Sequence, residues 1–268
     1  MKEQKLQLRE LIWPKLTDSE KKWVDGKTAI PLVEFSQKFA IIFSQASRYI
    51  ENFRTGWEGS ELSKIQQLYP SFDENEWSKR DLVRIYLMLC LPDSESKKVI
   101  KSFFEMAEMN ELVTLYKGLY FLKNATEFTS QVKEGIRTNM VNVFDAICLG
   151  NPYAAEYLEE AAWNQLILKA VFMERPLFKV YNIDKRKNKA LAEMLQDYIK
   201  ERWAARRTVT PEIWRMVDSF LNNNMKALFK EKEFIGLEKQ AIEAIVQQDS
   251  TWDKEFWDSI GERNISKT

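Results

Sequence analysis

The chain has 268 residues, enough for one large domain or two small ones around a substantial buried core. Hydrophobic residues make up 45% of it and charged residues 30%, which excludes wholesale disorder. Forty basic residues balance forty acidic ones, so no overall field attracts nucleic acid or an anionic membrane, and we expect no nucleic-acid partner. Its 8 glycines and 7 prolines are too few for the frequent turns of a many-stranded sandwich or barrel.

The chain contains no histidine, which removes several kinds of chemistry. Serine–histidine and cysteine–histidine catalysis are excluded, as are zinc sites that use histidine. Cys90 and Cys148 stand in separate apolar runs without metal-ligand spacing, which suits a reducing compartment. No phosphate-binding loop or nucleophile motif occurs. We therefore expect no cofactor and no bound metal, while catalysis by Lys, Asp, Glu or Tyr stays open.

The N-terminal residues have no apolar stretch as long as a secretory signal. The most apolar windows, FAIIF and RIYLMLCLP, are too short to span a bilayer. We therefore expect a cytoplasmic protein with no transmembrane segment.

A helix-start signal stands at Ser78, because Asp81 three residues later completes a capping box. The apolar residues that follow recur at helical spacing and fall on one face: Leu82, Ile85, Tyr86 and Leu89. Pro92 ends this helix.

Three more helices are expected after it. Asp93 or Ser94 can cap the first of them, and Asn110 opens the second. The third is long, begins near Phe128 and stops at Gly150, a residue type that commonly ends helices.

Helix restarts are expected at two prolines. Asn151 supplies an N-cap and Pro152 the first helical residue. The run VTP at 209–211 repeats the pattern: Thr210 is the cap and the proline after it the first helical residue. Val209 can also clasp Trp214 as a hydrophobic staple.

The helical period and the scarcity of breaks predict an all-α fold. We expect stacked helical hairpins in a right-handed, HEAT-like arrangement that forms a single compact unit, although no fixed-length repeat is visible. The predicted parts are an N-terminal helical extension (1–70), a helical core (71–221) and an acidic C-terminal helical segment (222–268). This last segment is expected to pack on the core, and a partner-binding arm is the alternative.

Polar residues stand out on the helix expected over 156–172, because apolar residues cover most of its circumference. Asn164 lies among apolar neighbours, so its amide must find hydrogen-bond partners. Gln165 and Lys169 share a separate edge, four residues apart. An amide that ties neighbouring backbone is the more frequent explanation for Asn164, and a ligand contact is the alternative.

Arg202 raises the same question on the helix expected from Lys189 to Ala205. The apolar stripe of this helix consists of Leu191, Met194, Leu195 and Tyr198, and Arg202 lies on the same face one helical turn further on. A guanidinium on a core face needs a carboxylate or a bound anion. We expect a bidentate internal carboxylate, from Glu156, Glu160, Asp184 or Glu212. If none is within reach, an anionic ligand becomes the better explanation.

These residues and others nearby in the predicted helices suit a pocket for a flat or phosphorylated molecule. The candidate binding residues are Arg137, Asn139, Asn164, Gln165, Lys169, Arg186, Arg202 and Trp203. Clusters of aromatic residues and arginine on helices more often serve packing, which is the alternative here. No catalytic residue and no metal ligand is assigned.

One region resembles a known family. The run WNQLILKAVF, the run DKRKN and the run DYIKERWAARRTVTPEIWR, in this order and spacing, resemble the EboA family over roughly Leu112 to Val217. The resemblance implies a helical protein from bacterial gene clusters that make or export secondary metabolites. It also implies partners among the other proteins of such a cluster, and it implies no particular reaction.

Two functions are consistent with these observations. The first is a non-catalytic helical scaffold or small-molecule carrier in a secondary-metabolite pathway, whose ligand is a small anionic or aromatic molecule. The second is an enzyme that acts on a prenylated, glycosylated or anionic metabolite through Arg, Lys and carboxylate groups. The missing histidine, metal ligands and phosphate loops favour the first. A deep polar pocket that contains Arg202 and Lys169 would favour the second.

Overall fold

The computed structural model describes residues 2–247 and 254–266. Throughout these ranges the regular elements are α-helices and short 3₁₀ helices, with no strand, which confirms the all-α prediction. The chain divides into two compact units, Met1–Tyr157 (unit 1) and Leu158–Thr268 (unit 2), instead of the single compact unit expected from the sequence. The right-handed, HEAT-like stacking and the division at 70 and 221 stay predictions.

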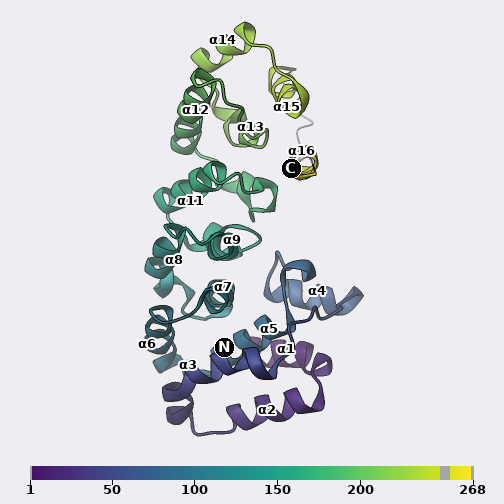
Figure 1. Ribbon diagram of the computed structural model, residues 1–268, viewed down its shortest axis with the longest axis vertical. Coiled ribbons are helices and arrows are strands. Elements are labelled where there is room, and N and C mark those ends of the chain that lie inside the picture. The colour runs from purple at the N-terminus through teal and green to yellow at the C-terminus, as the bar shows by residue number, and fades with distance from the viewer. Residues whose placement is uncertain (1, 248–253, 267–268) are drawn as a thin grey trace. The chain divides into compact units, whose positions relative to one another are not determined.

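Unit 1 is built from α-helices and short 3₁₀ helices (Figure 1). Figure 1 shows α6 and α8 along one side of this unit, with α7 and α9 beside them. Its α-helices are α1 (Lys2–Ile12), α2 (Asp18–Thr28), α3 (Leu32–Tyr49), α4 (Gly59–Leu68), α5 (Lys79–Cys90), α6 (Asp93–Phe104), α7 (Met109–Gly118), α8 (Thr129–Ile136), α9 (Val141–Cys148) and α10 (Pro152–Tyr157). The 3₁₀ helices are η1 (Trp13–Lys15), η2 (Glu74–Glu76), η3 (Leu119–Phe121) and η4 (Ala125–Phe128).

Unit 2 is also built from α-helices and short 3₁₀ helices. Its α-helices are α11 (Glu160–Phe172), α12 (Lys189–Ala204), α13 (Ile213–Val217), α14 (Asn223–Glu231), α15 (Gly236–Gln247) and α16 (Lys254–Ile265). Its 3₁₀ helices are η5 (Leu177–Lys179), η6 (Ile183–Arg186) and η7 (Asp218–Phe220). The helix expected without interruption over 156–172 is therefore broken, because α10 ends at Tyr157 and α11 begins at Glu160.

The start of α5 agrees with the sequence prediction. Ser78 Oγ accepts a hydrogen bond from Asp81 N at 3.1 Å, and Asp81 Oδ2 accepts one from Ser78 N at 3.1 Å. All four residues of the predicted apolar face are buried: Leu82, Ile85, Tyr86 and Leu89. The helix ends at Cys90, before Pro92. A reciprocal cap and a buried face thus fix α5 at the centre of unit 1.

The next two caps differ from the prediction. Helix α6 begins at Asp93, but Pro92 occupies its N-cap position and no side chain caps it, so neither Asp93 nor Ser94 has the expected role. Helix α7 begins at Met109, one residue before Asn110. Glu111 accepts a hydrogen bond from Glu108 N at 2.9 Å, so a glutamate satisfies the backbone at this end.

The single long helix expected from Phe128 to Gly150 is wrong, because the chain forms α8 and α9, which contact each other. Thr138 Oγ1 accepts a hydrogen bond from Met140 N at 3.1 Å between them. A threonine that bonds nearby backbone offers the chain an alternative to the helical ladder, and the chain turns here. Met140, which a continuous helix would place on the apolar stripe, is exposed.

One proline restart is confirmed and the other is displaced. Helix α10 begins at Pro152, and Asn151 Oδ1 accepts a hydrogen bond from Tyr153 N at 2.9 Å. Helix α13 instead begins at Ile213, because the chain first makes a turn in which Thr210 O accepts from Ile213 N at 3.1 Å. The hydroxyl of Thr210 therefore does not cap this helix.

An arginine holds three elements of unit 2 together. Arg215 on α13 is 1% exposed. Its Nε and Nη2 donate to Asp184 of η6 at 2.8 and 2.5 Å, and its Nη1 donates to Asp258 of α16 at 2.7 Å. The guanidinium thus joins α13 to the C-terminal helix α16 within this unit.

Glu212 gives unit 2 a predictable dependence on pH. It is 2% exposed, and its Oε1 accepts a hydrogen bond from Phe178 N at 2.6 Å. Burial raises the pKa of Glu212 from 4.5 to about 7, a shift that Arg215 opposes and Asp258 reinforces. Glu212 therefore binds its proton more strongly in the folded chain than in the unfolded chain between pH 4.5 and about 7, and its contribution to stability is lost as the pH rises through that window.

The variant Glu212→Gln tests this dependence, because a glutamine oxygen can still accept from Phe178 N without a charge. We expect raising the pH from 5 to 8 to lower the free energy of unfolding of the wild type by about 1–3 kcal/mol more than that of the variant. Urea denaturation of both proteins at the two pH values measures the difference. An equal change in both would show that Glu212 does not carry it.

Candidate functional site

The candidate site is a cleft of about 860 Å³ in unit 1, which we call the α3–α5 cleft. Helices α3, α5 and α7 and the end of α6 supply most of its lining, and the volume is in the range of small-molecule sites. The lining residues are Ala40, Ile41, Ser44, Gln45, Ser47, Arg48, Asn52, Glu76, Arg80, Asp81, Arg84, Phe103, Met106, Glu108, Asn110, Glu111, Val113 and Lys117.

Helix α3 presents one of its faces to the cleft. The residues it contributes recur at helical spacing from Ala40 to Arg48. The opposite face is core, where the ring centroids of Phe39 and Phe43 lie 5.8 and 5.1 Å from that of Phe103 on α6. This aromatic packing holds α3 against α6 and fixes the position of the polar face.

Two arginines of α5 line the cleft one helical turn apart. Arg80 Nε donates to Ile50 O at 2.9 Å, just beyond the end of α3. Arg84 Nε donates to Phe43 O at 3.3 Å, in the middle of α3. Both side chains are thus oriented through Nε. Within the described residues neither has a hydrogen bond from its terminal Nη groups.

Arg84 is the less satisfied of the two. It is 4% exposed, and its nearest carboxylate oxygen is Glu111 Oε1 at 3.9 Å from Nη2, beyond hydrogen-bond range. The guanidinium also lies 5.0 Å from the centroid of the Phe43 ring. Burial lowers the pKa of Arg84, which Glu111 and Asp81 oppose. A buried guanidinium with unmet donors is where a bound anion gains most.

The carboxylates that line the cleft already have other partners. Asp81 accepts hydrogen bonds from Ser78 and, at 2.6 Å, from Thr114 Oγ1. Glu111 accepts from Glu108 N. These anions serve the helix ends, so they do not satisfy the guanidinium groups beside them. The cleft is lined by equal numbers of positive and negative side chains, but guanidinium donors are still left without a hydrogen-bond partner among the described residues.

Lys117 of α7 adds a further positive charge. Its Nζ donates to Glu76 O at 2.5 Å and lies 4.8 Å from the centroid of the Trp77 ring. Burial lowers the pKa of Lys117, and Asp81 and Glu76 oppose this effect.

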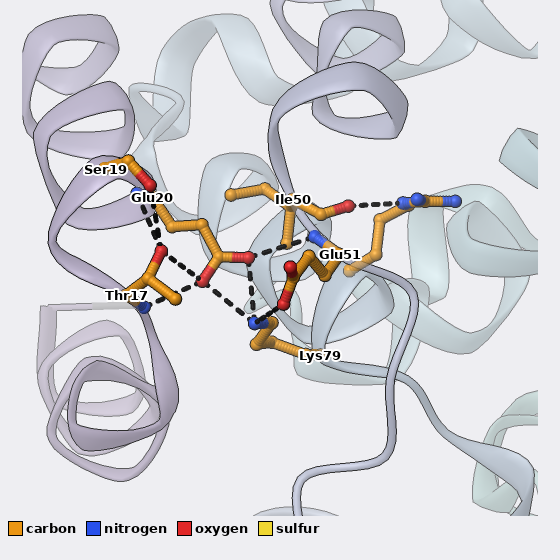
Figure 2. Close-up of polar contacts among 7 residues, drawn as sticks. Thr17, Ser19, Glu20, Ile50, Glu51 and Lys79 are labelled. Atoms are coloured by element: carbon orange, nitrogen blue, oxygen red, sulfur yellow. Dashed lines mark hydrogen bonds and ion pairs between the residues drawn. The ribbon is translucent and has the colours of Figure 1, made fainter.

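A buried ion pair beside the cleft fixes the start of α5 (Figure 2). Lys79 Nζ lies 2.8 Å from the carboxylate of Glu20, and these side chains are only 7% and 3% exposed. Glu20 also accepts from Thr17 N at 2.8 Å and from Glu51 N at 2.9 Å, as Figure 2 shows. Burial opposes the charge of Glu20, but these hydrogen bonds outweigh it and lower its pKa. The pair joins α2, the end of α3 and α5, next to Arg80.

None of the eight residues selected from the sequence lines the α3–α5 cleft. Arg137 and Asn139 belong to unit 1 and are exposed, and Arg137 pairs with Glu134 at 3.3 Å. The other six belong to unit 2. There, Gln165 is exposed, whereas Lys169 is half-buried and burial lowers its pKa. That the eight form one ligand pocket stays a prediction.

The prediction for Asn164 is confirmed. It is 4% exposed, and it exchanges two hydrogen bonds with the amide of Asn188, at 2.8 and 3.2 Å. Asn188 in turn caps α12 by accepting from Leu191 N at 2.9 Å and donates to Arg186 O at 3.3 Å. Its partner is thus a side-chain amide instead of backbone. The arrangement joins α11 to the start of α12.

Arg186 lies close to this amide pair. Its Nη2 donates to Leu158 O at 2.9 Å, and its guanidinium lies 4.8 Å from the centroid of the Trp163 ring. Burial lowers the pKa of Arg186, and Glu160 opposes the shift. Asn164 and Arg186 are therefore brought together through Asn188, in contacts that also serve packing.

The carboxylate expected for Arg202 is not found. Its Nε and Nη2 both donate to Thr208 O, at 2.9 and 2.8 Å, and the side chain is half-buried. Trp203 occupies the core position instead: it is 9% exposed, with ring centroids of Trp214 and Phe234 at 5.7 and 5.5 Å. The buried stripe of α12 thus lies one residue away from the predicted phase.

The fold and the cleft together define the class of protein to which this chain belongs. The chain is an all-α protein whose first unit holds a polar cleft with incompletely bonded guanidinium groups. No helix within the described ranges is long and apolar enough to cross a membrane. No group of three Cys, Asp or Glu side chains placed to hold a metal ion occurs in the same ranges.

A family profile described as metabolite traffic protein EboA matches residues 4–218. The chain therefore belongs to the EboA family, as the sequence resemblance indicated. The match covers the α3–α5 cleft and the Glu20–Lys79 pair. Neither the curated proteins nor the solved structures gave a match.

One signal in the sequence could have drawn attention to the arginines of α5, although not to the cleft itself. Arg80 and Arg84 recur at four-residue spacing on a helix that is apolar on most of its circumference, the same anomaly that drew notice to Arg202. Their partners on α3 and α7 come from distant parts of the chain, and the helical pattern alone does not bring these together.

Proposed function

We propose that this protein is a non-catalytic carrier that binds a small anionic metabolite in the α3–α5 cleft, within a pathway of metabolite synthesis or export. The observation that carries the proposal is Arg84, a 4% exposed guanidinium with one hydrogen bond among the described residues. Membership of a family described as metabolite traffic proteins supports the pathway context.

An anion in the cleft would complete the bonding of the arginines. Arg84 and Arg80 are both oriented by Nε, which leaves the planar Nη groups for a carboxylate or phosphate. Arg48 on α3 is exposed, lines the same cleft and has no ion pair within the described part of the chain. Three guanidinium groups on two facing helices suit a ligand with two or more anionic oxygens.

The state of the carboxylates supports binding over catalysis. A general acid or base must exchange a proton with its substrate. Asp81 and Glu111 instead accept hydrogen bonds from Thr114, from Ser78 and from backbone, so their oxygens already have partners within the protein. Their role in the proposal is to hold the helix ends around the ligand.

Lys117 favours a second candidate, an enzyme that acts on the same anionic ligand. Burial lowers the pKa of its amine, and this direction raises the fraction of neutral amine that can act as a nucleophile or general base. Mass spectrometry of the test anions named below, inorganic phosphate, glucose 6-phosphate and benzoate, after incubation with the protein separates the two candidates. Conversion of one of these anions that is lost in Lys117→Met would favour the enzyme, and its unchanged recovery favours the carrier.

The carrier is tested by calorimetric titration with inorganic phosphate, glucose 6-phosphate and benzoate. We expect at least one of these anions to bind the wild type, and Arg48→Gln and Arg80→Gln each to weaken that binding about tenfold, roughly the loss of one charge-assisted hydrogen bond. Arg137→Gln is the matched control, because Arg137 is exposed and does not line the cleft.

Two results would contradict the carrier. One is the absence of binding by any of the three anions. The other is binding that Arg48→Gln and Arg80→Gln leave at wild-type strength, which would place the anion elsewhere. Circular dichroism of each variant checks that the helices are retained.

A further inference from the structure

The α3–α5 cleft changes in character along its length. Its lining is apolar around Ile41 and Met106 and basic around Arg48 and Arg80. We propose that its ligand is an amphiphilic anion, with a charged group at the basic end and an apolar chain or ring at the other. This inference rests on the proposed carrier function and specifies its ligand class.

The hydrogen bonds to α3 establish the order of residues along the cleft. Arg84 is bound to the backbone of Phe43, and Arg80 is bound to that of Ile50. The arginines of α5 are therefore spread along the second half of α3, with Arg80 at its C-terminal end. Ile41 precedes both of these contact points, so the apolar end lies beyond Arg84.

The apolar end has side chains that face water. Ile41 on α3 is 61% exposed, and Met106 just after α6 is 65% exposed. Both line the cleft, as does the buried Phe103, whose ring packs on Phe39 and Phe43 of α3. An exposed isoleucine and methionine beside an aromatic ring can remove a ligand chain from water, and methionine adapts to irregular shapes.

The basic end holds three of the four cations of the lining, beside the carboxylates of Glu76 and Asp81. Arg48, Arg80 and Lys117 line it, with the amide of Asn52. On the side of α3 that faces the cleft, Arg48 stands seven positions after Ile41, which is about 10 Å along a helix axis. A single oxyanion fills only one end of such a length. A phosphate or carboxylate with a chain of about six carbons spans it.

The test compares three probes by calorimetric titration of the full chain: inorganic phosphate, hexyl phosphate and hexanol. Each methylene removed from water adds roughly fourfold in affinity. The apolar end is partly open, so the chain is only partly removed from water. We therefore expect the affinity for hexyl phosphate to be at least about tenfold higher than that for inorganic phosphate, and hexanol to bind most weakly.

Two variants assign the apolar end. Ile41→Asn and Met106→Gln both alter exposed side chains, so the fold is expected to tolerate them. We expect each to reduce the advantage of hexyl phosphate over inorganic phosphate about threefold and to leave phosphate binding unchanged. Met194→Gln is the control, an exposed methionine in unit 2.

The outcomes separate this inference from the proposed carrier function. Equal affinity for phosphate and hexyl phosphate would overturn the amphiphilic ligand and leave an anion carrier. An advantage for hexyl phosphate that Ile41→Asn and Met106→Gln do not change would also overturn it, since the chain would lie elsewhere. Hexanol binding as tightly as hexyl phosphate would overturn the amphiphilic anion, because the charged group would then add nothing. No binding by any of these probes would overturn it too, and it would reject the carrier as well if glucose 6-phosphate and benzoate also fail to bind.

Discussion

Replacing Arg215 by alanine is expected to lower the free energy of unfolding by about 3 kcal/mol, the low end of the range for breaking a buried ion pair. The arginine is 1% exposed, and among the described residues its removal leaves Asp184 and Asp258 with only the more distant ammonium groups of Lys187 and Lys254, at 3.4 and 3.9 Å. Asp184 and Asp258 are 38% and 26% exposed, so water compensates part of the loss and keeps it at the low end.

Arg202→Ala provides the matched comparison in the same unit. Arg202 donates to a backbone carbonyl and strands no carboxylate, so we expect its removal to lower stability by about 1 kcal/mol or less. Urea denaturation of the two variants at pH 7 measures both changes. Equal losses, or a larger loss for Arg202→Ala, would show that the assignment of the buried arginine is wrong.

Arg215→Lys tests the geometry of the same contact. A lysine keeps the positive charge but has no planar fork, and Arg215 makes three hydrogen bonds to two carboxylates through that fork. We expect a loss in the same urea experiment that is smaller than that of Arg215→Ala but still measurable. If Arg215→Lys unfolds at the same urea concentration as the wild type, a positive charge without the planar guanidinium is enough to stabilise this contact.

The error at Arg202 has a physical cause. The segment has two apolar stripes one residue apart, and the residues Leu191 and Leu195 are common to both. One continues through Tyr198 to Arg202, and the other through Ile199 to Trp203. The second is buried, because Trp203 packs on Trp214, and this contact depends on a residue in another helix. Helical period alone does not choose between such phases.

The sequence predicts local hydrogen bonds better than contacts between distant helices, and the other predictions follow the same division. The capping box at Ser78 and the cap at Asn151 are local, and both are present. The break near Thr138 is also local in its hydrogen bond, yet apolar residues continue at helical spacing through it and hide it. Asn164 was predicted correctly because an amide within an apolar wall must be bonded in any packing.

The α3–α5 cleft required the tertiary structure. Arg84 contacts Phe43, which is 41 positions away in the chain, and lies near Glu111, which stands on α7 beyond α6. In the sequence each of these charges is typical of a solvated helix face. Only the packing of α3 against α5 and α6 makes Arg84 a buried cation with few partners.

Replacing Lys79 by methionine is expected to lower the free energy of unfolding by about 3–5 kcal/mol, because it leaves the charge of Glu20 buried. The matched control is Lys38→Met. Lys38 pairs with Glu34 at 2.6 Å one turn away on α3, but these side chains are 56% and 41% exposed, so we expect a change of about 0.5 kcal/mol or less. Urea denaturation at pH 7 measures both variants.

The double variant Glu20→Gln, Lys79→Met separates the lost attraction from the stranded charge. A neutral glutamine can still accept hydrogen bonds from Thr17 N and Glu51 N, so we expect the double variant to be more stable than Lys79→Met alone. If it is less stable, the loss in Lys79→Met comes from the side chain of Lys79 itself and not from an unpaired carboxylate.

The dependence of this loss on pH gives an independent check. The pKa of Glu20 is lowered in the folded chain, so its ionised form adds stability above about pH 4.5, and this contribution is lost as the pH falls. Lys79 supplies part of that stabilisation. The difference in unfolding free energy between wild type and Lys79→Met is therefore expected to shrink as the pH is lowered from 6 to 3, because protonation of Glu20 removes the charge that Lys79 neutralises. A difference that stays constant over this range would mean that the ion pair in Figure 2 does not stabilise the start of α5.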